Sequence, residues 1–395
     1  MPYSTIEARH ISELCTVVDC EHKTAPYIDN SEYLVVRTSN VRNGQLLFDD
    51  MKFTTKEGYN EWTKRAIPEF GDVLFTREAP AGESCLVPND KKVCMGQRMV
   101  MLRPKKEVTD PIFFSYILNT ERTKADILRL SIGSTVSRIN IADIKKLKVA
   151  SPPLPEQRKI AKILSTWDKS ISSTERLIDN SKQQKKALMQ QLLTGKKRLL
   201  DDSGKPFEGE WEEAKLSNVA EVVMGSSPKS ASYNDNSEGL PLIQGNADIK
   251  NRKSVPRTYT NEVTKKCRIG DILLSVRAPV GTIAKSEHEA CIGRGISAIS
   301  TKKHHVQEYL YQWLLWFAPR WEKYSQGSTF EAVNSNDIKS LHLTVPSHSE
   351  QVKISAVLSN ADQEIELLEQ QLADLKQEKK ALMQQMLTGK RRVKI

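Results

Sequence analysis

The sequence predicts an α+β fold with two globular domains joined by two long helices, which form an antiparallel coiled coil with an internal pseudo-two-fold repeat. Three observations lead to this prediction. The stretch KKALMQQLLTGK at 185–196 recurs as KKALMQQMLTGK at 379–390, each copy ends a segment with a heptad pattern, and each segment follows a region of short strand signals. Internal repeats take precedence over other patterns because they set the architecture of the whole chain.

The repeat extends well beyond the matching stretch. With the same offset, GSTVSRINIADIKKL at 133–147 aligns with GSTFEAVNSNDIKSL at 327–341. Further upstream the match weakens and the offset drifts, as where GDVLFTREAPAG at 71–82 resembles GDILLSVRAPVG at 270–281. Two divergent front parts and two well-preserved back parts indicate two related tasks on two different targets.

Each half combines a globular head with a helical tail. The expected divisions are a first globular domain at 1–150, a central helix region at 151–198, a second globular domain at 199–345 and a C-terminal helix region at 346–395. Within the heads, the alternating runs at 71–76 and 97–104 predict strands. The longer apolar patterns at 110–130 and 307–324 predict one helix in each head.

Each preserved back part predicts one long helix. Apolar residues recur with alternating spacings of four and three, which keeps a narrow seam on one face of a supercoiled helix. Basic residues are in excess between Glu156 and Leu192, whereas acidic residues are in excess between Glu350 and Met386. Opposite net charge and a shared register predict that the two helices pair with each other. The residues predicted for helix pairing and partner docking are Ile160, Leu164, Trp167, Ile171, Ile178, Leu188, Leu192, Ile354, Leu358, Ile365, Leu368, Leu372, Leu375, Leu382 and Met386.

Two lysines interrupt the seams at equivalent positions, Lys185 and Lys379. Their amines either extend along the helix to solvent, or they mark a place where the seam opens to receive the helix of a partner. Duplicated units that pack as one body are usually related by a two-fold axis, and an axis perpendicular to the helices makes them antiparallel. Helices of this size, roughly 55 Å long, would then act as a ruler between the two heads.

The composition favours a nucleic-acid partner. The formal net charge is +10 and the isoelectric point is near 9.1, which suits an anionic partner, although an inert basic surface is the alternative. The N-terminus has no apolar core of signal-peptide length, and the apolar run at 309–317 is too short to cross a membrane. The six cysteines form no CxxC pair, so we expect no metal site and a cytoplasmic location.

Base recognition requires bidentate donors, such as Arg toward guanine or Asn and Gln toward adenine, and phosphate contact requires basic side chains. The alternative for these residues is a solvated strand or turn, and for the asparagines a turn-forming role. The candidate DNA-binding residues are Arg37, Asn40, Arg42, Arg77, Ser134 and Thr135 in the first head, and Gln244, Asn246, Lys250, Arg252, Lys253, Arg277, Ser328 and Thr329 in the second.

No catalytic centre emerges from the sequence. SPPL at 151–154 superficially resembles the tetrad of amino-methyltransferases, but Leu154 stands where an aromatic residue would stack on a flipped base. There is no GxxxxGK[ST] loop for ATP and no compact Cys/His cluster. We therefore expect a chain without catalytic residues, which recognises something and leaves chemistry to other proteins.

At this point the chain resembles the specificity subunit of type I restriction–modification enzymes. The resemblance rests on PPLPEQRKIAKIL at 152–164, GKPFEGEW at 204–211, GDILLSVRAPVG at 270–281 and the LLTGK helix end at 192–196, and it covers essentially the whole chain. Two features depart from the pattern. VPSHSEQ at 345–351 replaces a second Pro-Leu-Pro-Glu-Gln-like segment, and Cys20 stands where the second head has Gly225.

The resemblance implies a non-catalytic subunit that binds double-stranded DNA. Each head would be a target-recognition domain for one half of a split sequence, and the antiparallel helices would set the gap. The helices would also dock two methyltransferase subunits, which methylate adenine with S-adenosylmethionine. A motor/nuclease subunit that uses ATP and magnesium would join them, so these cofactors are expected on the partners and none on this chain.

Two other functions remain open at the level of the sequence. A coiled-coil adaptor with two protein-binding heads would bind DNA weakly and without dependence on salt, whereas true DNA binding weakens steeply with salt. A stand-alone nucleic-acid enzyme would be active as a purified single chain, and the missing cofactor motifs argue against it.

Overall fold

A computed structural model describes residues 6–133, 137–321 and 332–394. The chain divides into two compact units, of which unit 1 comprises residues 1–175 and 370–395 and unit 2 comprises residues 176–369. Each unit contains one globular head and parts of both long helices. The predicted α+β fold with two heads, two paired helices and an internal repeat is confirmed.

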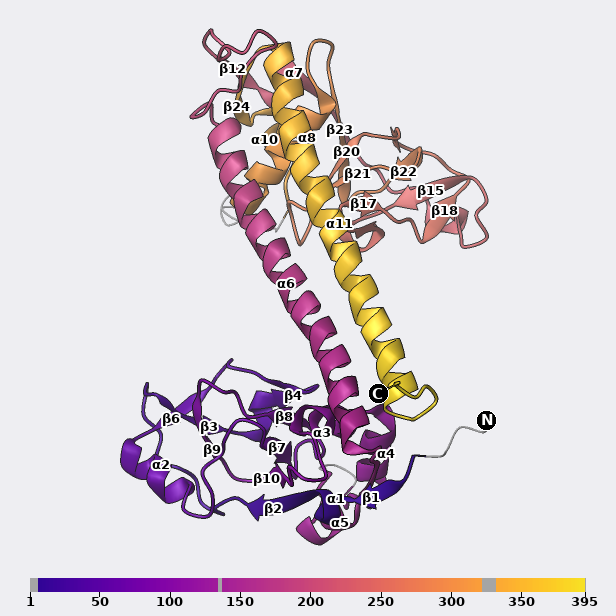
Figure 1. Ribbon diagram of the computed structural model, residues 1–395. Helices are drawn as coiled ribbons and strands as arrows, with labels where there is room; N and C mark the ends of the chain where they lie inside the picture. The colour runs from indigo at the N-terminus through magenta and orange to yellow at the C-terminus, as the bar shows by residue number, and fades with distance from the viewer. Residues whose placement is uncertain (1–5, 134–136, 322–331, 395) are drawn as a thin grey trace. The chain divides into compact units, whose positions relative to one another are not determined.

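The first head, drawn in indigo to purple in Figure 1, is built on two small sheets. The four-stranded sheet is antiparallel, in the order β2 (Cys15–Asp19), β10 (Met99–Pro104), β7 (Val73–Thr76) and β8 (Ser84–Leu86). In the three-stranded sheet, β3 (Tyr33–Val36) lies between antiparallel β6 (Lys52–Thr54) and parallel β9 (Lys92–Met95). Two further strand pairs are β1 (Ala8–His10) with β11 (Lys148–Ala150) and β4 (Val41–Arg42) with β5 (Gln45–Leu46).

The four-stranded sheet is buried on both faces. Val73 and Phe75 of β7 pack into a cluster that includes residues of the long helices, whereas Leu74 between them packs with residues of β3 and β9. Successive side chains of a strand point to opposite faces, so one strand contributes to both clusters. This arrangement explains why the inner strands β7 and β10 are composed mainly of apolar residues.

The helices of the first head are α1 (Ile11–Leu14), α2 (Lys56–Trp62), α3 (Pro111–Leu118), α4 (Glu121–Leu130) and α5 (Ile141–Lys146). The prediction of a single helix at 110–130 is wrong, because the segment forms two helices, α3 and α4. Between them, the Thr120 hydroxyl accepts a hydrogen bond from the Thr123 N–H and begins α4. A capping threonine in extended backbone starts a new helix, and this local effect outweighs the continuous apolar pattern.

The second head repeats the plan with larger sheets. The first sheet has the order β13 (Ala220–Met224), β23 (Ile296–Thr301), β20 (Ile272–Ser275), β21 (Ile283–Lys285), β17 (Lys253–Ser254) and β16 (Ile249–Lys250). The second has the order β14 (Tyr233–Asn234), β18 (Thr258–Thr260), β15 (Leu240–Ile243), β22 (Ala290–Ile292) and β19 (Lys266–Cys267), with β15 parallel to β22. β12 (Glu212–Lys215) pairs with β24 (His342–Val345).

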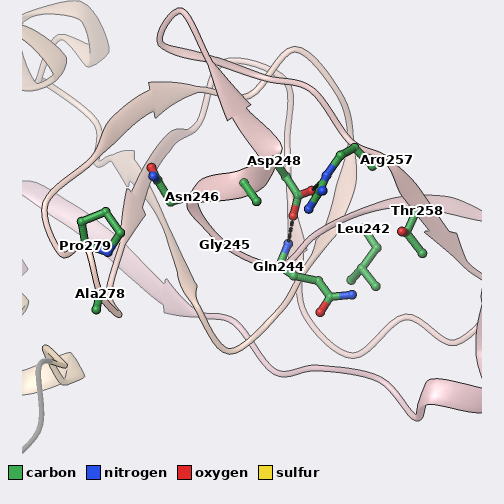
Figure 2. Close-up of a pocket in the computed structure, with 10 residues that line it drawn as sticks. Leu242, Gln244, Gly245, Asn246, Asp248, Arg257, Thr258, Ala278 and Pro279 are labelled. Atoms are coloured by element: carbon green, nitrogen blue, oxygen red, sulfur yellow. Dashed lines mark hydrogen bonds and ion pairs between the residues drawn. The ribbon is translucent and has the colours of Figure 1, made fainter. Parts of the chain in front are cut away.

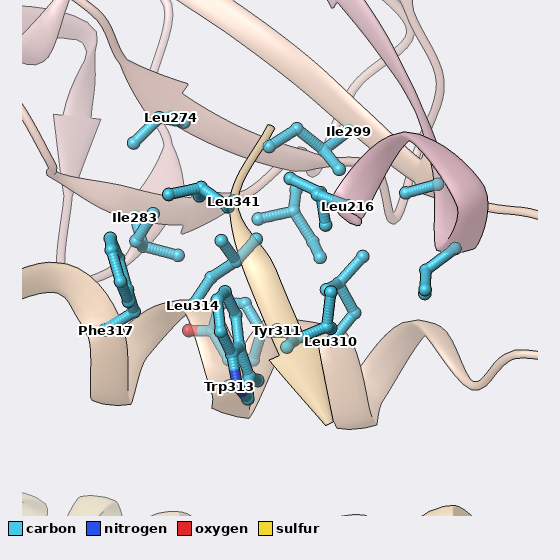
Figure 3. Packing of buried hydrophobic residues seen from close by; sticks show 14 of the residues in the cluster. Leu216, Leu274, Ile283, Ile299, Leu310, Tyr311, Trp313, Leu314, Phe317 and Leu341 are labelled. Carbon is cyan, nitrogen blue, oxygen red and sulfur yellow. The ribbon is translucent and has the colours of Figure 1, made fainter. Parts of the chain in front are cut away.

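The core of the second head forms around α8 (Gln307–Phe317). Figure 3 shows Leu310, Tyr311, Trp313, Leu314 and Phe317 of this helix facing side chains of the first sheet. The other short α-helices among the described residues of this head are α7 (Leu216–Val219), which adds two buried residues to the same cluster, and α10 (Ser335–Lys339), which adds one. Apolar side chains on several turns of α8 are needed for this packing, which accounts for the aromatic-rich sequence of the helix.

The two long helices are α6 (Leu154–Leu192) and α11 (His348–Met386), each of 39 residues. Figure 1 draws α6 in magenta and α11 in yellow, each as an unbroken helix. Each glycine that follows, Gly195 or Gly389, has a positive φ of 68° or 76°, as expected for the residue after a helix C-terminus. No helix among the described residues is long and apolar enough to span a membrane.

Candidate nucleic-acid interface

In unit 1, the start of α6 packs against the end of α11. Three ion pairs join the segments, Glu156 with Arg392 at 2.6 Å, Asp168 with Lys379 at 2.5 Å and Glu175 with Lys376 at 2.8 Å. Residue numbers rise along α6 as they fall along the C-terminal segment, so the paired segments are antiparallel. Beneath the charges, Ile160 and Leu164 are fully buried in the cluster that contains Met386.

In unit 2, the remaining parts of the helices make the same contacts with their roles exchanged. The ion pairs are Arg198 with Glu350 at 2.7 Å, Lys185 with Asp362 at 2.5 Å and Lys182 with Glu369 at 2.6 Å. Each is the counterpart, at the offset of the sequence repeat, of one ion pair in unit 1. The duplicated sequence therefore makes one set of helix contacts twice, and the direction is again antiparallel.

The seam lysines are held by carboxylates of the opposite helix. The Lys185 side chain is only 6% exposed and its amine donates to Asp362, so it does not extend to solvent. A hollow of about 210 Å³ lies beside it, lined by Leu188, Ala361 and other residues of the two helices. Whether this hollow receives a partner helix stays a prediction.

Asp362 is the centre of a network between the helix pair and the second head. Its carboxylate accepts hydrogen bonds from Lys185, from Gln312 of α8 at 2.9 Å and from Arg252 at 3.0 Å. Burial alone would raise the pKa of this carboxyl, but the hydrogen bonds from Lys185 and Gln312 and the nearby positive charges lower it below its ordinary value. Asp362 is therefore ionised at neutral pH.

All fifteen predicted seam residues are buried or partly buried. The most enclosed are Ile160, Leu164, Leu192, Ile354 and Leu358 at 0% exposure, followed by Ile178, Ile365 and Met386. The partly buried ones are Trp167, Ile171, Leu188, Leu368, Leu372, Leu375 and Leu382. Burial supports their expected part in helix packing, and docking of a partner by any of them stays a prediction.

The candidate residues of the first head lie mostly in the loop after β3. Asn40 is fully buried in η1 (Thr38–Asn40), where its amide oxygen accepts the Arg37 N–H at 3.1 Å and its amide nitrogen donates to the carbonyls of Leu47 and Asp49. The structure thus gives Asn40 a loop-forming role, which is the alternative considered for it. A contact with a base would require these bonds to break.

The arginines of the first head differ in accessibility. The Arg37 side chain is 27% exposed and pairs with Asp50 at 2.8 Å, and Arg42 donates to two backbone carbonyls. Arg77 is 8% exposed and pairs with Asp19 at 3.3 Å, so its position favours a structural role over contact with DNA.

In the second head, Gln244 and Asn246 line a cavity of about 550 Å³ at the end of β15. Figure 2 shows this cavity, whose wall also includes Asp248, Arg257 and Pro279. Asn246 and Asp248 begin and end η3 (Asn246–Asp248). The sequence therefore predicted two residues that the fold brings together around one concave surface.

Two residues at this cavity were not among the candidates. The Asp248 side chain is 5% exposed, and its two oxygens accept the Gln244 backbone N–H at 2.8 Å and the Arg257 Nε at 2.9 Å. Arg257 lies among several basic residues of the sequence between 250 and 268, but nothing in the sequence indicates that a buried carboxylate holds it. The only signal was the aspartate that follows Gln244 by four residues.

The remaining candidates of the second head are exposed. Lys250, Arg252 and Lys253 lie on the hairpin of β16 and β17, and Arg252 has a positive φ of 59°. Arg277 is exposed next to Pro279 of the cavity wall. Four candidates, Ser134, Thr135, Ser328 and Thr329, lie outside the described residues.

The described ranges contain no group of three or more His, Cys, Asp or Glu side chains that could hold a metal ion. The six cysteines are buried free thiols. Burial raises the pKa of Cys85 and of Cys94 to about 12, which is opposite to what a nucleophilic thiolate needs.

The comparisons with known proteins point to one family. The model of the type I restriction modification DNA specificity domain matches residues 3–181 and 208–377, one match in each repeat. The chain is 32% identical, over 98% of its length and 94% of the relative, to the type I restriction enzyme MjaX specificity subunit of Methanocaldococcus jannaschii.

Solved structures show the same fold. The type I restriction–modification system S subunit from M. genitalium matches with a TM-score of 0.64 and 16% identity over 98% of each chain. A chain from work on complex assembly and conformational transition of the type I R-M system matches with a TM-score of 0.62 and 23% identity, over 97% of this chain and 98% of that one.

Proposed function

The chain belongs to the family of DNA specificity subunits of type I restriction–modification systems, and we propose that each of its two heads reads one half of a bipartite, gapped DNA site. As a specificity subunit it is non-catalytic, and the methyltransferase activity belongs to partner subunits. Its partners are DNA and other subunits of the system.

One observation carries the proposal of two half-sites. The helix contacts recur pair by pair. The ion pair Glu156–Arg392 corresponds to Glu350–Arg198, and the ion pair Glu175–Lys376 corresponds to Glu369–Lys182. The corresponding loops of the heads do not recur, since the loop after β3 and the loop after β15 carry different polar residues. Recognition of two different half-sites requires a duplicated frame, here the two long helices with their repeated ion pairs. It also requires two different reading surfaces, here the loops after β3 and after β15.

The same duplication supports docking of two identical methyltransferase subunits on equivalent helix surfaces. In this proposal the paired helices set the spacing between the half-sites. S-adenosylmethionine, ATP and magnesium would be bound by the partner subunits. Adenine methylation would then be directed by this chain without any group of its own entering the reaction.

The test is long-read methylation mapping of DNA from cells that express this chain with its methyltransferase subunit. The matched control is the same cells without this chain. We expect a gapped two-part motif that disappears in the control. If the subunits assemble and the methylation pattern is the same in both strains, the chain does not direct recognition, and an adaptor function becomes the better account.

Salt dependence of binding provides an independent check on the same complex. Neutralisation of several phosphates releases counterions, so the observed DNA affinity should fall linearly on a double logarithmic scale of salt concentration. An adaptor that binds proteins through its heads would show weak DNA binding without this slope.

A further inference from the structure

We propose that Arg257 reads a guanine in the half-site recognised by the second head, and that Asp248 is the positioning residue that orients its guanidinium group. This inference rests on the proposed function and adds the identity of one base. It is carried by the geometry of the cavity at the end of β15 (Figure 2).

Asp248 fixes one edge of the arginine. Its carboxylate is 5% exposed, and one oxygen accepts the Arg257 Nε at 2.9 Å while the other accepts the Gln244 N–H at 2.8 Å. The Arg257 side chain is 66% exposed, and its two terminal nitrogens have no hydrogen-bond partner among the described residues. A guanidinium held at Nε presents these two nitrogens in one plane as a pair of donors.

Such a pair of donors matches one base edge in particular. In the major groove guanine offers the acceptors O6 and N7 side by side, and arginine can bind both. A lysine can also donate to these two acceptors, but its compact ammonium group has no planar fork that a carboxylate could orient. Asp248 reduces the freedom of the arginine before DNA binds, which lowers the cost of forming the two hydrogen bonds.

The first head shows that the loop does not need the carboxylate for its own fold. In both heads a glycine N–H donates to the last strand residue, Gly96 to the carbonyl of Val36 and Gly293 to the carbonyl of Ile243. The next residue is capped by Asn40 in the first head and by Asp248 in the second. Asn40 caps the backbone as a neutral group and closes the loop by donating to two carbonyls.

A charged group at the same place in the second head therefore has another task. Burial of a carboxylate is costly unless the charge is paired, and Arg257 is its partner in the second head. Where the first head has an asparagine that closes its loop, the second head has an ion pair that holds an exposed arginine. This substitution of Asn by Asp between the repeats is the observation that separates a specificity residue from an ordinary surface ion pair.

The experiment maps methylation in cells that carry the complete complex with Arg257→Lys, Arg257→Gln or Asp248→Asn in this chain. We expect Arg257→Gln to lower the preference for guanine at one position of one half-site by about tenfold or more, the range of a bidentate contact. Arg257→Lys should lower it by a smaller factor, because lysine keeps donors but loses the planar fork. Asp248→Asn should lower it at the same position by a smaller factor. The other half-site, read by the first head, should be unchanged and shows that the complex is folded.

Arg268→Lys is the matched control, because Arg268 is also exposed in the second head and should leave the motif unchanged. If Arg257→Gln retains the full guanine preference, or weakens methylation equally at all sequences, Arg257 does not read this base and the proposal is overturned. A bipartite motif without guanine in the affected half-site also overturns it but leaves the proposed function intact. Absence of any bipartite motif overturns both.

Discussion

The loop after β3 in the first head and the loop after β15 in the second begin from the same backbone bonds and end in different chemistry. Asn40 closes the first loop onto backbone carbonyls, whereas Asp248 opens the second by holding Arg257 at its edge. The helix pair behaves in the opposite way, because its ion pairs recur at the repeat offset with the same residue types. The two repeats therefore share the ion pairs between the long helices and differ in the polar residues of the loops after β3 and β15.

The largest expected effect is a loss of stability from a buried residue of the long helix α11. Leu358 is fully buried against the second head and the helix pair, so Leu358→Ala should lower the free energy of unfolding by about 3 to 4 kcal/mol through lost burial and a cavity. Leu367→Ala on the same helix is the control, because Leu367 is 71% exposed and should cost less than about 0.5 kcal/mol. Chemical denaturation measures both, and equal effects would contradict the packing.

The exchange of Asn and Asp between the loops should be asymmetric. In the native loop the Asn40 amide nitrogen donates to the carbonyls of Leu47 and Asp49. Asn40→Asp replaces this donor with a carboxylate oxygen. The Arg37 N–H could still donate to one carboxylate oxygen, but the other oxygen would face the two carbonyls without a donor. Because this arrangement is repulsive and buried, we expect a loss of about 3 kcal/mol. Asp248→Asn keeps the cap on Gln244 and should cost less than about 1 kcal/mol. Similar losses for both variants would contradict the different roles given to Asn40 and Asp248.

The twin ion pairs on the seam should differ in strength because they differ in burial. Asp362→Asn leaves the Lys185 amine, 6% exposed, without its carboxylate and should cost about 3 kcal/mol. Asp168→Asn affects Lys379 at 19% exposure and an aspartate that is 42% exposed, so about 1 kcal/mol is expected. Equal losses would mean that burial does not set the strength of these pairs.

The smallest expected effect is the acid sensitivity of the helix ends. Hydrogen bonds from Arg392 and from the Val393 N–H hold the pKa of Glu156 below its ordinary value. Such a carboxyl stabilises the fold at pH values above its ordinary pKa, about 4.3, and this contribution disappears as the pH falls through the lower folded value.

The free energy of unfolding should therefore decline below about pH 4.3, and Glu156→Gln should make the decline shallower. Unfolding curves collected across this pH range measure both slopes. An unchanged slope in Glu156→Gln would show that the pair with Arg392 does not contribute to acid sensitivity.

Much of the architecture follows from the sequence because it depends on periodicity and repetition. The seam residues follow from the heptads, and the antiparallel direction follows from the two-fold relation expected of duplicated units. The break between α3 and α4 was missed because a cap at Thr120 outweighs a continuous apolar pattern.

The candidate site was less accessible from the sequence. Gln244 and Asn246 were found because their residue types suit base recognition, and they do meet at one cavity. The contact between Asp248 and Arg257 was missed because it depends on how the chain from η3 returns through β16 and β17. Asn40 and Arg77 were chosen by residue type, and only the fold shows that they are buried.

The central claim is that two equivalent frames carry two independent reading surfaces. The direct test replaces the second head, residues 212–345, with a second copy of residues 8–150 and maps the methylated motif in the complete complex. The account predicts a motif in which the original second half-site is replaced by an inverted copy of the first, with methylation retained. A motif that keeps the original second half-site, or one that changes in both halves, would contradict it.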